Sequence, residues 1–161
     1  MIKPRNMAVR ELTAAAIIAA VYCALTLITI EFSFGGMQVR VAEALTVLPV
    51  FTPAAIPGLF VGCLISNLIG GVSLLDRIIG PLATLAAAMC TRSLRRESMA
   101  LAMLPPVLIN AVVVGLILHL EFGSPYVIFV CSVGLGQIAA CYGLGLPLAS
   151  ALRKMPADLL T

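Results

Sequence analysis

Residues 44–75 read ALTVLPVFTPAAIPGLFVGCLISNLIGGVSLL, a run of 32 residues without a charged side chain. As one helix, a run of this length would extend about 48 Å, far beyond the ~30 Å hydrocarbon core of a bilayer. Pro49, Pro53 and Pro57 interrupt it, because proline lacks a backbone donor and clashes with the preceding helical turn. We therefore predict a short helix ending near Pro53 and another beginning at Pro57.

Long apolar runs also lie on both sides of this stretch. Hydrophobic residues make up 61% of the chain and charged residues 11%, whereas a soluble domain carries about 25% charged residues. This composition excludes a soluble enzyme, and it predicts an all-α polytopic membrane protein of the cell membrane. We expect a six-helix transmembrane bundle that forms a single integral-membrane domain over residues 1–161. The remaining predicted spans are Leu12–Ile30, Ile78–Thr91, Met99–Leu120 and a last run that ends at Leu152.

The basic residues predict the orientation of the bundle. Short connections on the cytoplasmic side are enriched in Lys and Arg. Arg40 and Arg77 lie on one set of connections, whereas the other set carries eight basic residues: Lys3, Arg5, Arg10, Arg92, Arg95, Arg96, Arg153 and Lys154. Both termini are therefore predicted to be cytoplasmic. The basic residues form no stripe with interleaved aromatics, so we expect no nucleic-acid partner.

Motifs for catalysis are absent from the sequence. It contains no phosphate-binding loop, no H-E-x-x-H and no G-x-S-x-G. Its one histidine, His119, excludes a His-rich metal site, and its five cysteines lie in apolar runs without C-x-x-C spacing. We expect no enzyme activity, no metal and no cofactor.

Small and polar residues within the spans have two possible roles. Gly58, Gly62, Ser66 and Gly70 recur at every fourth position, which favours close helix packing. We interpret Asp76–Arg77 as a solvated turn. Polar side chains at depth should face another helix or a ligand, because unpaired polar groups in hydrocarbon are costly. Both alternatives, contact with another helix and contact with a ligand, stay open for Asn67, Asn110 and Gln137.

The connection from Glu31 to Glu43 is the longest polar loop. Glu43 lies at its end, where its carboxylate could pair with Arg40 or meet a cationic ligand. Phe32 and Phe34 could stack on a flat heterocycle or anchor the loop at the membrane interface.

Residues 35–67, GGMQVRVAEALTVLPVFTPAAIPGLFVGCLISN, resemble the queuosine-precursor transporter family (QueT), whose members are S components of energy-coupling factor (ECF) transporters. The resemblance extends over essentially the whole chain, although Met37 and Ala42 depart from the expected isoleucine and serine. It implies that the chain captures a 7-deazaguanine such as preQ1 outside the cell. It also implies partners, namely a transmembrane coupling subunit and two ATPase subunits, and no ATP hydrolysis by the chain itself.

The resemblance also suggests roles for particular residues. The aminomethyl cation of preQ1 would be held by Glu43 or Glu121, and its purine-like edge would be read by Asn67, Asn110 and Gln137. Gln38 and Arg40 would contribute to a lid or its bracing, and Phe34 or Phe32 would stack on the ligand. Docking on the coupling subunit would use Ala16 and Ala20, with Ala15 and Ala19 in an overlapping register.

Two other function classes are compatible with a small membrane protein. A stand-alone secondary transporter or channel would usually carry ionisable residues at membrane depth, whereas the charges here lie at span ends in the sequence. A membrane structural or assembly factor would show helix packing without a ligand pocket.

Overall fold

The computed structural model describes residues 4–33 and 40–154, and within these ranges the chain forms helices and no strand. The helices are α1 (Pro4–Ile28), α2 (Ile30–Ser33), the 3-10 helix η1 (Val41–Val50), α3 (Ala55–Ile69), α4 (Leu74–Ser93), α5 (Met99–Ala102), α6 (Leu104–Phe122), α7 (Tyr126–Ile138), the π-helix η2 (Ala139–Gly145) and α8 (Leu146–Leu152). The all-α prediction is confirmed.

Among the described residues, four stretches are long and apolar enough to cross a membrane: Ala8–Ile28, Leu74–Ser93, Met99–Phe122 and Tyr126–Leu152. The two helices of the proline-rich stretch are shorter, with 10 residues in η1 and 15 in α3. The chain breaks between them as the prolines predict, since η1 ends at Val50 and α3 begins at Ala55. The count of six membrane spans stays a prediction.

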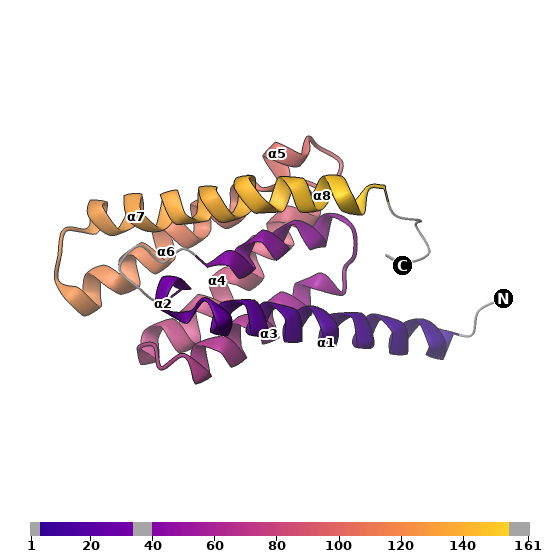
Figure 1. Ribbon diagram of the computed structural model, residues 1–161, viewed down its shortest axis with the longest axis horizontal. Coiled ribbons are helices and arrows are strands. Elements are labelled where there is room, and N and C mark those ends of the chain that lie inside the picture. The colour runs from indigo at the N-terminus through magenta and orange to yellow at the C-terminus, as the bar shows by residue number, and fades with distance from the viewer. Residues whose placement is uncertain (1–3, 34–39, 155–161) are drawn as a thin grey trace.

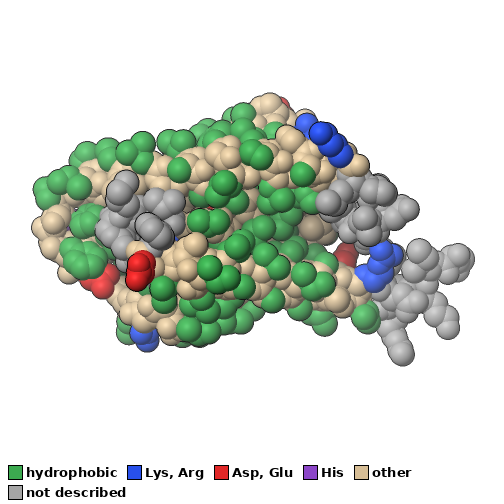
Figure 2. Space-filling model, viewed as in Figure 1, with side chains coloured by type: hydrophobic (Ala, Val, Ile, Leu, Met, Phe, Trp, Pro, Cys, Tyr) green, Lys and Arg blue, Asp and Glu red, His purple; other side chains and the backbone are tan. Residues whose placement is uncertain are grey.

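The helices form an elongated bundle (Figure 1). In this view α7, η2 and α8 continue one another along one edge, and α1 runs along the other edge. α1 begins and α8 ends at the same end of the bundle, as expected if both termini share one side of the membrane. Figure 2 shows hydrophobic side chains over the flanks of this face, with charged side chains toward the two ends. That the shared side is cytoplasmic stays a prediction.

α1 and α3 approach each other closely at two glycines of the small-residue repeat. A Cβ atom added at Gly58 would lie 2.8 Å from the carbonyl oxygen of Ala15. One added at Gly62 would lie 2.8 Å from Cβ of Tyr22 and 2.9 Å from the carbonyl oxygen of Ala19. The packing role predicted for this repeat is therefore confirmed at these two positions.

The prediction of a solvated turn at Asp76–Arg77 is wrong. α4 begins at Leu74, and the hydroxyl of Ser73 caps it by accepting a hydrogen bond from the backbone N–H of Asp76 at 3.2 Å. Asp76 is 3% exposed, while Arg77 is half-buried and donates from Nε to the carbonyl oxygen of Val72. Asp76 is buried because it forms an ion pair with Arg40.

Candidate ligand-binding site

Glu43 is a buried carboxylate held by three helices. It lies in the first turn of η1 and is 1% exposed. The hydroxyl of Tyr22 in α1 donates to Oε1 at 2.5 Å, and the amide Nδ2 of Asn110 in α6 donates to Oε2 at 3.2 Å. Both donors are neutral, and each points a hydrogen at the carboxylate. This arrangement suits an ionised Glu43, which accepts at both oxygens.

The backbone of Glu43 contacts the π-helical turn η2. The hydroxyl of Thr46 donates to the carbonyl oxygen of Glu43 at 2.6 Å. The Cys141 sulfur lies 3.7 Å from the same oxygen and 3.5 Å from Oε1 of Gln137. Gln137 is 3% exposed, and Cys141 links this predicted ligand residue to the backbone of Glu43. We refer to Tyr22, Glu43, Asn110, Gln137 and Cys141 as the Glu43 cluster.

Arg40 belongs to a second buried group, formed with Asn67 and Asp76, which we call the Arg40 cluster. Its Nη2 donates to Oδ2 of Asp76 at 3.0 Å, and its Nη1 donates to Oδ1 of Asn67 at 3.3 Å. Asn67 in turn donates from Nδ2 to the backbone carbonyl oxygen of Asp76 at 3.0 Å. Burial alone would lower the pKa of the Arg40 guanidinium, but the nearby Asp76 carboxylate raises that pKa above its ordinary value. Arg40 thus forms its ion pair with Asp76 and not with Glu43. The cationic ligand suggested for Glu43 stays a prediction.

The Arg40 cluster braces the start of η1. Besides its contacts with α3 and α4, Arg40 donates from Nε to the carbonyl oxygen of Ser33 at 3.4 Å. A Cβ atom at Gly80, one turn after Asp76, would collide with Oδ1 of Asp76. That oxygen is buried and has no hydrogen-bond partner among the residues described. Glycine at position 80 thus leaves the room that Asp76 needs to reach Arg40.

The two clusters differ in charge. Within residues 8–31, 33 and 40–154, whose side chains the structure describes, the buried charged residues are Arg40, Glu43 and Asp76, which give one positive and two negative charges. Arg40 and Asp76 form an ion pair. Glu43 has no cation within ion-pair distance in these ranges. A buried carboxylate that is held only by neutral donors can receive a cation.

The other predicted site residues lie elsewhere. Glu121 is exposed near the end of α6, and the 11 residues that separate it from Asn110 correspond to about 16 Å of helix. It therefore does not join Glu43. Gln38 and Phe34 lie outside the described residues, as does the side chain of Phe32.

The two alanine registers of α1 face different ways. Ala15 and Ala19 are 9% and 6% exposed and lie against α3. Ala16 and Ala20 are exposed. Ala15 and Ala19 therefore serve packing within the chain. Ala16 and Ala20 remain the predicted docking pair.

Sequence reasoning missed Tyr22 and misjudged Asp76. A signal for Tyr22 is present, because Ala15, Ala19 and Tyr22 follow one another at helical spacings of four and three residues and share the face that packs on α3. No comparable local signal marks Asp76, whose partner Arg40 lies 36 residues earlier in the chain.

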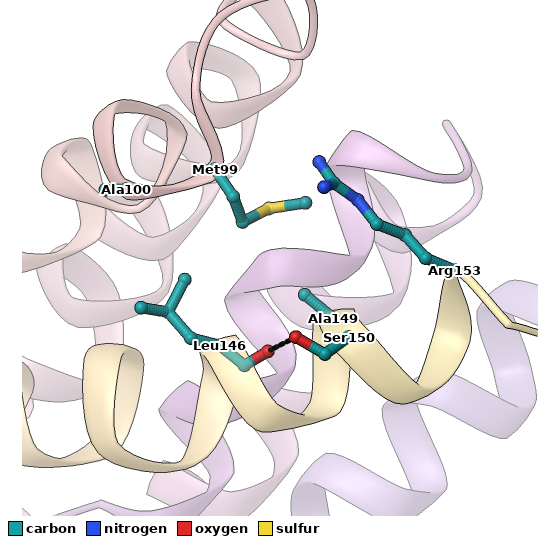
Figure 3. Close-up of a pocket in the computed structure, with 6 residues that line it drawn as sticks. All are labelled: Met99, Ala100, Leu146, Ala149, Ser150 and Arg153. Carbon is teal, nitrogen blue, oxygen red and sulfur yellow. Dashed lines mark hydrogen bonds between the residues drawn. The ribbon is translucent and has the colours of Figure 1, made fainter.

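A hollow of about 270 Å³ lies between α5 and α8, lined by Met99, Ala100, Leu146, Ala149, Ser150 and Arg153. In Figure 3 the side chains of Met99 and Arg153 extend toward each other across it. The hydroxyl of Ser150 donates to the carbonyl oxygen of Leu146 at 2.9 Å. None of the predicted ligand residues lines this hollow, so it is separate from the Glu43 cluster.

A family model described as QueT transporter matches residues 12–154, which include both buried clusters and both alanine registers. No curated protein and no solved structure matches the chain. Across the described residues, no group of three or more His, Cys, Asp or Glu side chains is placed to hold a metal ion.

Proposed function

Because this chain belongs to the QueT transporter family, we propose that it is the substrate-binding subunit of an ECF-type importer. Membership makes it a multi-pass membrane transporter for a queuosine precursor, not an enzyme. In the proposed cycle the chain captures a preQ1-like 7-deazaguanine outside the cell. A separate ATPase module then drives delivery to the cytoplasm.

The observation that carries the choice of ligand is that Glu43 forms no ion pair with the side chains that the structure describes. Its carboxylate is buried and receives hydrogen bonds from the neutral Tyr22 and Asn110, whereas Asp76 neutralises Arg40. Burying an unpaired charge is costly, and a cationic ligand group would remove that cost. The aminomethyl cation of preQ1 fits this requirement, while a neutral 7-deazaguanine does not.

The other buried side chains have separate roles in this proposal. Gln137 is linked to the backbone of Glu43 through Cys141, and it can read the purine-like edge with one donor and one acceptor. Asn110 is shared between Glu43 and that edge. Arg40 donates a hydrogen bond to Asn67, and Asn67 donates one to Asp76. In this proposal they stabilise the site without contacting the ligand.

The proposed partners are a transmembrane coupling subunit and two ATPase subunits. The support from this chain is the exposed pair Ala16 and Ala20 on α1, since small side chains permit another helix to approach closely. Ala15 and Ala19 offer a matched internal comparison, because they are small as well but packed against α3.

Isothermal titration of the purified chain tests the ligand proposal, since the sequence has no tryptophan to report binding by fluorescence. We expect preQ1 to bind more tightly than preQ0 or guanine. Glu43→Gln should lower the affinity for preQ1 at least about 10-fold, the scale of one hydrogen bond to a charged group. Glu121→Gln is the matched control and should leave affinity unchanged. Unchanged preQ1 affinity in a folded Glu43→Gln protein would contradict the assignment of the carboxylate.

One observation favours a second candidate, a stand-alone secondary transporter. Arg40, Glu43 and Asp76 are all buried in the structure, and ionisable residues inside a membrane protein often mark a transport pathway. Reconstitution of this chain alone in proteoliposomes separates the two candidates. Uptake of preQ1 without any ATPase subunit would support the secondary transporter, and uptake only with the ATPase module would support the importer.

A further inference from the structure

Tyr22 differs from the other tyrosines of the chain in the acceptor of its hydroxyl hydrogen bond. It is fully buried, and its hydroxyl donates to Oε1 of Glu43. The hydroxyls of Tyr126 and Tyr142 donate to the backbone carbonyl oxygens of Val112 and Ala100. Tyr22 is thus the one tyrosine whose hydroxyl donates to a carboxylate.

The depth of Tyr22 is set by the close approach of α1 to α3. Without a side chain at Gly62, the α3 backbone can lie directly against Tyr22, where an added Cβ would come within 2.8 Å of the tyrosine Cβ. This contact fixes the backbone from which the phenol ring reaches Glu43 in η1. The short hydrogen bond therefore depends on the packing of two helices.

The electrostatic role of the hydroxyl follows from its surroundings. Burial disfavours an ionised carboxylate, whereas hydrogen bonds donated to the ionised form favour it. At 2.5 Å, the Tyr22–Glu43 distance falls in the range typical of a hydroxyl donating to an anion. Arg40, Cys63 and Cys141 are titratable groups that interact electrostatically with Glu43. Asp76 and Arg92 lie on α4, one of the helices packed against η1; the helices packed against η1 also carry Arg10, Glu11, Cys23, Arg77, Cys90 and Tyr142. Asp76 is paired with Arg40, and Arg92 donates to the carbonyl oxygens of Pro49 and Val50.

We propose that Tyr22 is a positioning residue that keeps Glu43 ionised and oriented to receive a cation. The contribution of Tyr22 to ligand binding rests on the proposed function, whereas its effect on the ionisation of Glu43 does not. Tyr22→Phe removes the hydroxyl and keeps the ring, so Glu43 should take up a proton at higher pH than in the unaltered chain. Tyr142→Phe is the matched control, because it removes a hydroxyl that donates to the backbone carbonyl oxygen of Ala100 and not to a carboxylate.

The first test uses thermal unfolding of the ligand-free protein at pH 6 and pH 8. A folded state that binds a proton more readily than the unfolded state gains stability as pH falls. Tyr22→Phe should therefore lower the melting temperature more at pH 8 than at pH 6. In a Glu43→Gln background this pH dependence should vanish, because position 43 no longer titrates. Equal losses at both pH values, or a pH dependence that persists without Glu43, would overturn the proposal.

The second test measures preQ1 binding by titration at the same two pH values. Loss of one hydrogen bond to a charged group should raise the ratio of Kd at pH 6 to Kd at pH 8 by up to about 10-fold in Tyr22→Phe. Tyr142→Phe should keep the ratio of the unaltered chain. An unchanged ratio in Tyr22→Phe would contradict the role in binding. Absence of preQ1 binding by the folded unaltered chain would instead contradict the proposed function and leave the unfolding test to decide on Tyr22.

Discussion

The Arg40 cluster and the Glu43 cluster are both buried and both built around a carboxylate, yet the groups that contact this carboxylate differ in charge. In the Arg40 cluster, the carboxylate of Asp76 meets a guanidinium of the same chain at 3.0 Å. In the Glu43 cluster, the carboxylate meets a phenol and an amide. The comparison teaches that burial and hydrogen bonding alone do not distinguish a brace from a binding group. What distinguishes them is whether the chain supplies the opposite charge.

The largest effect on stability is expected from Asp76→Asn, which tests the brace. The substitution keeps the shape of the side chain but leaves the buried Arg40 guanidinium without its counter-charge. Removing one partner of a buried ion pair costs about 3–5 kcal/mol. Chemical unfolding in detergent measures the loss. A loss below about 1 kcal/mol, the scale of a surface ion pair, would remove the distinction between the clusters.

Gly80→Ala should have an intermediate effect on the same cluster. The added Cβ would collide with Oδ1 of Asp76 and push the carboxylate away from Arg40. We expect a loss of about 1–3 kcal/mol, as for other overpacked sites. Gly143→Ala is the control, because a Cβ there meets nothing within 4 Å. If both variants unfold alike, the room at Gly80 is not what positions Asp76.

Glu43→Gln tests whether the Glu43 cluster contributes less to stability than the Arg40 cluster. The amide cannot accept at both positions, which weakens the bond from Tyr22 or from Asn110. The substitution also removes a buried charge that forms no ion pair with the described side chains. We expect these effects to offset each other to within about 1 kcal/mol. The same unfolding measurement applies. A loss as large as that of Asp76→Asn would mean that the Glu43 cluster also acts as a brace.

The smallest effect is expected on the outer face of α1, opposite the Glu43 cluster. Ala16→Leu should change stability by no more than about 0.5 kcal/mol, because Ala16 is exposed. Ala19→Leu should cost about 1–3 kcal/mol by overpacking against α3. Co-purification with the coupling subunit then tests docking, which Ala16→Leu should weaken. Retained co-purification with Ala16→Leu would contradict docking through this face.

Local patterns in the sequence predicted the helices well. The prolines of residues 44–75 marked the break between η1 and α3, and the glycine repeat marked α3 as a helix that packs closely against another. These features depend on neighbours within one or two turns of the same chain segment. They are therefore visible without knowledge of the fold.

Long-range pairing explains what the sequence did not predict. From the sequence alone, Asp76 resembles a polar turn residue. Its pairing with Arg40 becomes visible only when the fold brings α4 next to Arg40. The choice between the registers Ala15–Ala19 and Ala16–Ala20 likewise depends on which face of α1 meets α3. Asn67, Asn110 and Gln137 were expected to face another helix or a ligand, and the structure buries all three, but their roles toward a ligand stay predictions.

The π-helical turn η2 changes the angular register of the long rod from α7 to α8. Gln137 and Ala149 are 3% and 2% exposed, so both face the bundle interior although they are 12 residues apart. In an uninterrupted α-helix this separation would rotate one side chain about 120° from the other, whereas a turn with one extra residue reduces the angle to about 20°. A one-residue deletion within Ala139–Gly145 would thus leave both side chains facing inward. The same deletion elsewhere between them would rotate one by about 100° toward the bilayer.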